Sequence, residues 1–213
     1  MNKAIVVLNR GVCGCNSRQG LMRLPKLLKT DRPQILIIGF GVNDALNSSA
    51  LVEIGEFEMN IKKMIETAEK SGVRSIVINT INPIIADYVK ARHQYSFDED
   101  LNRRVERYNQ VLRKIVQLPD ILLNDFHKLV STGNLDELLQ NEANSGIRDG
   151  LHLTAAGAGL LGESIAALLK EHVKPGEIIL CLGDSITYGV ALPGCGTSNG
   201  STYPAKLEEI LRT

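Results

Sequence analysis

Residues Ile178-Ile179-Leu180-Cys181-Leu182-Gly183-Asp184-Ser185-Ile186-Thr187 run from an apolar stretch straight into a Gly-Asp-Ser turn. The apolar part, Glu177–Leu182, lacks the alternation of a half-exposed strand, so it predicts a strand that is buried on both faces of a parallel sheet. Ligands of such sheets bind at the carboxyl ends of the strands, which makes Ser185 a candidate functional residue. A serine in this position can also simply cap the next helix, so Ser185 alone decides nothing.

Four further apolar runs predict strands of the same kind. They are Lys3–Leu8, Gln34–Gly39, Arg74–Asn79 and Asp120–Leu123. Amphipathic patterns between and after them predict helices over Leu51–Ser71, Phe97–Gln117, a segment that begins at Thr154 as N-cap, and Pro204–Leu211. Strands that alternate with helices in this way predict a doubly wound α/β fold with a five-stranded parallel sheet.

The composition limits the classes of protein to which the chain can belong. Its 213 residues include 24 basic and 24 acidic side chains and 44% hydrophobic residues, which predicts a single domain over residues 1–213. The balanced charge disfavours nucleic acid as a partner, and no apolar run is long enough to span a bilayer. The N-terminus lacks the pattern of a signal peptide, so we expect a cytoplasmic protein. The four cysteines form no disulfide framework, and no motif supports a redox role for Cys13 and Cys15.

Three other motifs lack the context that their chemistry needs. Gly157–Gly162 has the spacing of a dinucleotide fingerprint but no strand directly before it, which favours glycines that let a helix pack closely. Gly196–Gly200 has the spacing of a nucleophile elbow, again without a preceding strand. The histidines outside the Asp149 segment show no metal-ligand spacing, so solvated or capping roles are favoured for His93, His127 and His172. No metal or organic cofactor is predicted.

Three more polar segments fall at predicted strand ends or at the mouth of the sheet. Asp149-Gly150-Leu151-His152 places an acid three residues before a base, and these are the two groups that a serine nucleophile needs. Gly39–Asp44 follows the second strand, where the side-chain amide of Asn43 can donate to a developing oxyanion. Asn9–Asn16 follows the first strand, and a glycine N–H in this segment can be a second donor to the oxyanion. Each segment alone has an ordinary structural explanation, but their joint occurrence favours catalysis.

Together these segments resemble the blocks of the SGNH, or GDSL, hydrolases, a family of serine esterases and lipases with a flavodoxin-like fold. Gly183-Asp184-Ser185-Ile186-Thr187 is similar to the nucleophile block of the family, and Asn9–Gly14 is similar to its glycine block. Gly41–Asp44 and Asp149–His152 are similar to the asparagine block and the acid–base block. With all four blocks present, the resemblance extends over nearly the whole chain.

The resemblance implies a three-layer α/β/α sandwich and a carboxylic ester hydrolase that acts on a small-molecule ester without a cofactor. It implies a catalytic triad of Ser185, His152 and Asp149. The oxyanion hole that it implies consists of Gly14, Asn43 and the N–H of Ser185. A second class of function stays open, namely a non-catalytic module that binds a carbohydrate or a nucleotide on the same fold. Turnover of a short p-nitrophenyl ester distinguishes the two.

The order of the blocks departs from the family pattern. The family runs from the nucleophile block to the glycine, asparagine and acid–base blocks, whereas the nucleophile block comes last here. We therefore expect a circular permutant in which Val173–Gly176 joins the usual termini and Met1 lies near Thr213. With strands numbered along this chain, the resemblance to the flavodoxin-like arrangement implies a spatial order of 1-5-2-3-4. The competing arrangement is a swap of the segment after Gly176 into a second molecule.

Overall fold

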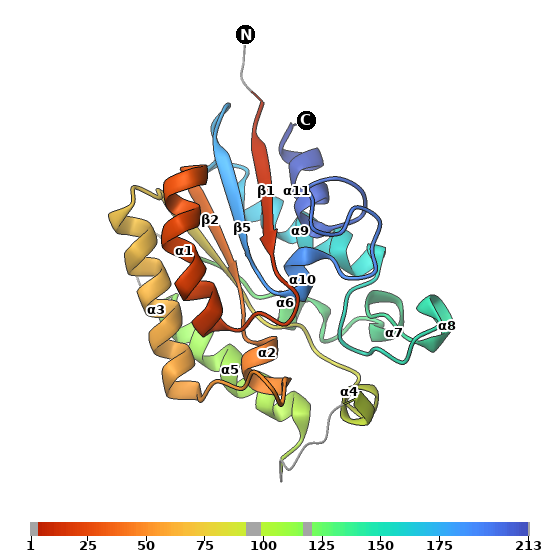
Figure 1. The fold of residues 1–213 in the computed structure, drawn as a ribbon. Coiled ribbons are helices and arrows are strands. Elements are labelled where there is room, and N and C mark those ends of the chain that lie inside the picture. Colours follow the sequence, from red (N-terminus) through yellow and green to blue (C-terminus); the bar gives the residue numbers. More distant parts are fainter. Residues whose placement is uncertain (1–3, 93–98, 117–120, 213) are drawn as a thin grey trace.

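A computed structural model describes residues 4–92, 99–116 and 121–212 of the chain. In this part of the chain, five strands form one parallel sheet in the order β1-β5-β2-β3-β4, which is the predicted order (Figure 1). The strands are β1 (Val6–Gly11), β2 (Ile35–Gly39), β3 (Ser75–Asn79), β4 (Ile121–Asn124) and β5 (Ile178–Gly183). The longer helices are α1 (Ser17–Asp31), α3 (Ile54–Lys70), α5 (Leu101–Ile115), α9 (Ala155–Leu169) and α11 (Tyr203–Arg212). The shorter ones are α2 (Val42–Leu46), α4 (Ala86–Arg92), α6 (Phe126–Val130), α7 (Leu135–Leu138), α8 (Glu142–Ser145) and α10 (Ser185–Tyr188).

Helices cover both faces of the sheet, which gives the predicted three-layer α/β/α arrangement (Figure 1). Helices α1, α3 and α5 pack on one face, and α9 and α11 pack on the other. Successive side chains of a strand point to opposite faces, so Leu36 and Ile38 of β2 join the first core while Ile35 and Ile37 join the second. All four are almost completely buried. Burial on both faces is the reason that the strand sequences are apolar throughout.

Strand β5 lies between β1 and β2, although it follows them by more than a hundred residues. The register aligns Gly183 at its carboxyl end with Gly11 of β1 and Gly39 of β2. A Cβ on Gly183 would lie 2.1 Å from Thr187 Oγ1 and 2.7 Å from the Gly39 carbonyl oxygen, so only glycine fits there. This close approach lets β5 turn at once into α10, which begins with Ser185.

The last helix runs beside the first strand (Figure 1). The Val7 N–H donates to Glu208 Oε1 at 3.0 Å, and Arg212 Nε donates to the Ile5 carbonyl at 3.1 Å. These two contacts make α11 antiparallel to β1, as predicted. The expected proximity of Met1 and Thr213 falls outside the described residues.

The observed boundaries differ from the predicted ones by a few residues. Strand β1 is shifted from Lys3–Leu8 to Val6–Gly11 because Asn9, Arg10 and Gly11 also pair with β5. As an edge strand, β1 tolerates polar side chains. The predicted terminal residues that lie outside the described part of the chain are Lys3, Phe97, Gln117 and Asp120.

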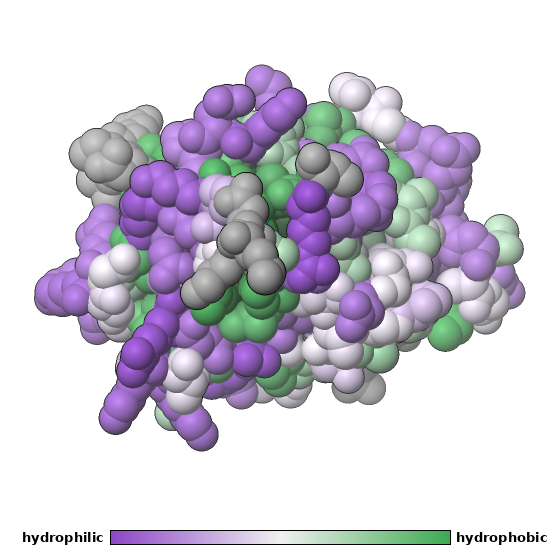
Figure 2. Space-filling model, turned by 90° about the horizontal axis from the view of Figure 1, so that it is seen from above, coloured by the Kyte–Doolittle hydropathy of each residue, from purple (hydrophilic) through white to green (hydrophobic). Residues whose placement is uncertain are grey.

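The edge of the sheet at which the strands begin is shown from above in Figure 2. Hydrophilic residues dominate this face and surround small hydrophobic patches. The candidate site residues lie at the other edge, where the strands end. Among the described helices, none combines the length and the apolar character needed to cross a membrane.

The glycine-rich segment of α9 packs closely against its neighbours, as predicted for Gly157–Gly162. A Cβ on Gly162 would lie 2.9 Å from both the Tyr203 carbonyl oxygen and Lys206 Cβ of α11. A Cβ on Gly159, three residues earlier on the same helix, would meet nothing within 4 Å. Contact between α9 and α11 therefore requires a glycine at position 162 only.

We expect Gly162→Ala to lower the free energy of unfolding by about 1–3 kcal/mol, because the added methyl group forces α11 away from α9. The matched variant Gly159→Ala should raise it by up to about 1 kcal/mol, since alanine favours the helical conformation. Urea denaturation of both variants and the natural protein measures the difference. Equal effects of the two substitutions would contradict the described helix contact.

Candidate active site

Three side chains predicted from the sequence form a hydrogen-bonded chain at the carboxyl edge of the sheet. His152 Nδ1 lies 2.8 Å from Asp149 Oδ2, and His152 Nε2 lies 3.0 Å from Ser185 Oγ. With an ionised Asp149, the proton of the imidazole sits on Nδ1, so that Nε2 can accept the hydrogen of the Ser185 hydroxyl. All three residues belong to one chain, in which 33 residues separate His152 from Ser185.

The Asp149–His152 turn is built by its own hydrogen bonds. Asp149 Oδ1 accepts from the N–H groups of Leu151 at 2.9 Å and His152 at 2.7 Å, which leaves Oδ2 for the imidazole. Gly150 has a φ of +69°, and a Cβ there would lie 2.9 Å from the Ile85 carbonyl oxygen. Conformation and space both therefore require glycine between the acid and the base.

The environment of Asp149 keeps its carboxyl group ionised. Burial opposes ionisation, but the hydrogen bond and charge of His152, together with the N–H groups of His152 and Leu151, outweigh it. They hold the pKa of Asp149 well below its usual range. An ionised carboxylate in this position can orient the imidazole and stabilise an imidazolium.

The predicted oxyanion donors, Gly14, Asn43 and Ser185, follow three different strands and border one cavity. Gly14 has a φ of +73°, and neither its N–H nor that of Ser185 donates to an acceptor within the described residues. Asn43 lies in α2, just after β2, and its Nδ2 donates to the Cys15 carbonyl oxygen at 3.1 Å. The three groups border the same site, so they can converge on one substrate oxygen.

The side chain of Asn43 is oriented by a residue that the sequence analysis does not single out. Asn47 Nδ2 donates to Asn43 Oδ1 at 3.0 Å. This bond fixes the orientation of the Asn43 amide, with its oxygen toward Asn47 and its nitrogen toward Cys15. The spacing of four residues is the sequence signal, because it places two amides next to each other on a helix.

A cavity of about 230 Å³ opens beside Ser185 and His152. Its apolar wall is formed by Val42, Leu46, Val89, Leu151 and Val190. Its remaining lining is Cys13, Gly14, Asn43, Asn47, His152 and Ser185. None of the described residues that line it carries a carboxylate, ammonium or guanidinium group.

Asp184, next to the candidate nucleophile, is in a very different environment from Asp149. Its side chain is almost completely buried, and burial raises the pKa of its carboxyl group to about 7. The N–H of Ile186, which donates to Asp184 Oδ1 at 2.9 Å, and the charge of His152 offset only part of this effect. Asp184 is the N-cap of α10 and so fixes the position of Ser185, the first residue of that helix.

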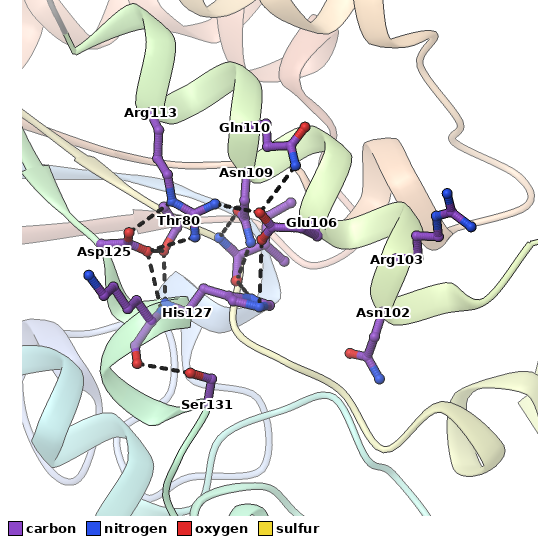
Figure 3. A network of polar contacts seen from close by, with 12 residues as sticks. Thr80, Asn102, Arg103, Glu106, Asn109, Gln110, Arg113, Asp125, His127 and Ser131 are labelled. Atoms are coloured by element: carbon purple, nitrogen blue, oxygen red, sulfur yellow. Dashed lines mark hydrogen bonds and ion pairs between the residues drawn. The ribbon is translucent and has the colours of Figure 1, made fainter.

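A second polar cluster, shown in Figure 3, holds helix α5 against the segments that follow β3 and β4. His127 Nδ1 lies 2.9 Å from the Ile81 carbonyl oxygen, and its Nε2 lies 3.8 Å from Glu106 Oε2. Arg113 pairs with both Glu106 and Asp125 at 2.8 Å. His127 is thus tied into a network that joins elements, and the described residues contain no group of three side chains suited to a metal ion.

Comparisons with known proteins agree with this architecture. A model of the GDSL-like lipase/acylhydrolase family matches residues 1–160. The chain is 26% identical over 176 residues to the GDSL esterase/lipase WDL1 of Oryza sativa subsp. japonica, covering 78% of this chain and 65% of that protein. It is 31% identical over 72 residues to Esterase TesA of Pseudomonas aeruginosa, covering 34% of each. The chain thus spans less than two thirds of the length of both relatives.

One solved structure shows the same fold over most of this chain. The crystal structure of the lipase/acylhydrolase from Enterococcus faecalis matches with a TM-score of 0.64. The match covers 82% of this chain and 99% of that chain. At 20% sequence identity, this likeness concerns the fold alone.

The raised pKa of Asp184 predicts a loss of stability as the pH rises from acidic to neutral. Between about pH 4, where an unfolded aspartate ionises, and about pH 7, the folded protein holds a proton that the unfolded chain has released. The free energy of unfolding therefore falls as the pH rises through this interval. We expect Asp184→Asn to flatten that decline, which urea denaturation at a series of pH values measures. All other titrating groups are common to both proteins, so an equal slope would contradict the buried carboxyl.

Proposed function

The chain belongs to the GDSL-like lipase/acylhydrolase family, and on that premise we propose that it hydrolyses carboxylic esters of small molecules with Ser185 as the nucleophile. The observation that carries the proposal is the hydrogen-bonded chain from Asp149 through His152 to Ser185, at 2.8 and 3.0 Å. A binding module has no need for an acid, a base and a nucleophile in this order. The adjoining cavity provides a place for the substrate.

In the first half of the reaction, Ser185 Oγ attacks the ester carbonyl carbon while His152 Nε2 takes the hydroxyl proton. Asp149 keeps the resulting imidazolium in place and stabilises its charge. The tetrahedral intermediate then collapses, the bond between the carbonyl carbon and the alcohol oxygen breaks, and His152 protonates the departing alcohol. An acyl group remains on Ser185.

In the second half, a water molecule replaces the alcohol. His152 Nε2 takes a proton from the water as its oxygen attacks the acyl carbon, and returns the proton to Ser185 Oγ when the carboxylic acid leaves. The net reaction consumes one ester and one water and forms one acid and one alcohol, so no cofactor enters the balance.

Negative charge develops on the carbonyl oxygen in both halves. The N–H groups of Gly14 and Ser185 and the Nδ2 of Asn43 are the donors that this proposal assigns to that oxygen. Preorganised donors of this kind stabilise the transition state more than the bound ester. Asn47 supports the assignment because it holds the oxygen of the Asn43 amide, so that Nδ2 is the group on the other side. One hydrogen of Nδ2 donates to the Cys15 carbonyl oxygen, and the substrate oxygen would take the other in place of the long contact with Asp184 Oδ2 at 3.5 Å.

The lining of the cavity favours an uncharged group beside the scissile carbonyl. Aliphatic side chains form one wall, and a charged group placed there would lose its hydration without a partner. A cavity of about 150 Å³ accommodates a benzene molecule, so about 230 Å³ suits a small group.

Replacement of the nucleophile is the experiment that tests the proposal. The natural protein should turn over p-nitrophenyl acetate, and Ser185→Ala should lower turnover on the order of 10⁶-fold, because a serine triad without its nucleophile keeps little activity. Ser198→Ala is the matched control: its Oγ donates to the Val7 carbonyl, away from His152. It should retain full turnover.

Two outcomes would contradict the assignment. One is a Ser185→Ala variant that keeps more than a few per cent of the turnover while circular dichroism shows it folded. The other is a natural protein without turnover of any short ester, which would favour a non-catalytic binding module.

We further propose that the order of the blocks is a circular permutation. The family model matches residues 1–160 and stops before Gly183–Thr187, the segment that resembles the first block of the family. The link before β5 is a short exposed turn in which the Lys174 N–H donates to Glu177 Oε2 at 2.8 Å. The contacts of Val7 with Glu208 and of Ile5 with Arg212 join the first strand to the last helix. They support the proposal that the first and last residues of the present chain are neighbours.

A relinked chain tests the permutation. It would begin at Gly176, run to residue 213, continue through a short Gly-Ser linker into residue 1, and end at Pro175. Because β1 and α11 already lie side by side and the opened turn is exposed, we expect the natural circular dichroism spectrum and undiminished ester turnover. A relinked chain that fails to fold would contradict the proposed neighbouring ends.

A further inference from the structure

Gln140 lies between the segment that carries His152 and the segment that follows Ser185. It stands outside every motif of the sequence analysis, and only 4% of its surface is exposed. Its main chain is bonded to the Asp149–His152 turn on both sides. The Gln140 N–H donates to the His152 carbonyl oxygen at 2.8 Å, and the Gly150 N–H donates to the Gln140 carbonyl oxygen at 2.7 Å.

The side-chain amide of Gln140 joins two segments of the candidate site. Its Nε2 donates to the Leu153 carbonyl oxygen at 2.9 Å and to the Val190 carbonyl oxygen at 2.9 Å. An amide nitrogen carries two hydrogens, so this arrangement uses both. Leu153 follows His152 directly, and Val190 closes the turn after α10 by donating its N–H to the Ser185 carbonyl oxygen.

These bonds connect the segment that carries His152 with the segment that follows Ser185. They therefore constrain the distance between His152 Nε2 and Ser185 Oγ, on which proton transfer depends. The His152–Ser185 contact and the Gln140 side chain both link residues 149–153 to residues 184–192 by hydrogen bonds. The first link must break and re-form during a reaction, because His152 hands its proton to the leaving group. The second link includes none of the reacting atoms, so it can persist.

We propose that Gln140 is a positioning residue that keeps His152 Nε2 within proton-transfer distance of Ser185 Oγ. The inference rests on the proposed function, since it concerns the efficiency of that reaction. A displacement of about 1 Å in a reacting group lowers the rate about 100-fold. Loss of the hydrogen bonds of the Gln140 side chain should therefore lower kcat. Gln140 is not among the residues that line the cavity, so KM should change little.

The test compares two buried amides that are neighbours in sequence. Gln140→Met keeps the length of the side chain and removes both donors, and we expect kcat for p-nitrophenyl acetate to fall about 10- to 100-fold with KM within about threefold. Asn141 is equally buried, and its Nδ2 donates to the Asp136 carbonyl oxygen at 2.7 Å, away from both segments. Asn141→Leu should therefore leave kcat within about twofold.

A second variant covers the case in which Gln140→Met does not fold. Gln140→Asn keeps an amide but is one methylene shorter, so it cannot reach both carbonyl oxygens, and it should show the same fall in kcat. The proposal is wrong if either folded Gln140 variant keeps natural kcat. It is also wrong if Asn141→Leu loses as much kcat as they do, because general loosening then explains the effect. The turnover of the natural protein and its dependence on Ser185 are measured separately. A failure of the Gln140 proposal therefore does not contradict the proposed function.

Discussion

The pairing of β5 between β1 and β2 is the constraint on which the candidate site depends. This pairing brings the carboxyl ends of three strands together at Gly11, Gly183 and Gly39. The loops after those ends carry the residues assigned to the oxyanion and the nucleophile. The atoms around position 183 leave no room for a side chain, so only a glycine there lets the chain turn directly into Ser185. A register shift of one residue would move Gly183 out of the position in which only glycine fits, and it would move Ser185 away from His152.

Two aspartates close to Ser185 have carboxyl pKa values shifted in opposite directions, because their burial and hydrogen bonding differ. Asp149 receives two backbone N–H groups and the imidazole of His152, and these keep it ionised. Asp184 is more deeply enclosed and receives fewer donors, so its carboxyl group favours the neutral form up to about pH 7. One carboxylate thus supplies the charge that the proposed mechanism needs, while the other serves the local fold.

The sequence predicts the parts of the structure whose causes are local. Apolar runs and strand-end motifs lead to the five strands and to Ser185, His152 and Asp149 as candidates, because parallel strands bring their carboxyl ends together. The order of the strands in the sheet is implied by the resemblance to the GDSL hydrolases and not by these local patterns. Helix α1 is not predicted because Pro25 interrupts its pattern, although Asn16 and Gln19 form a capping box at its N-terminus. Gln140 escapes because its partners are backbone carbonyls of Leu153 and Val190, 13 and 50 residues away. Backbone partners leave no trace in the side chains of a single sequence.

The central claim is that His152 activates Ser185 within one chain. Mass spectrometry after incubation with a fluorophosphonate tests it most directly, because the reagent reacts with an activated serine and leaves a covalent mark. The account predicts one adduct per chain, on the peptide that contains Ser185, and strongly slowed labelling in His152→Ala. An adduct on Ser198, or labelling of Ser185 at the same rate without His152, would contradict it.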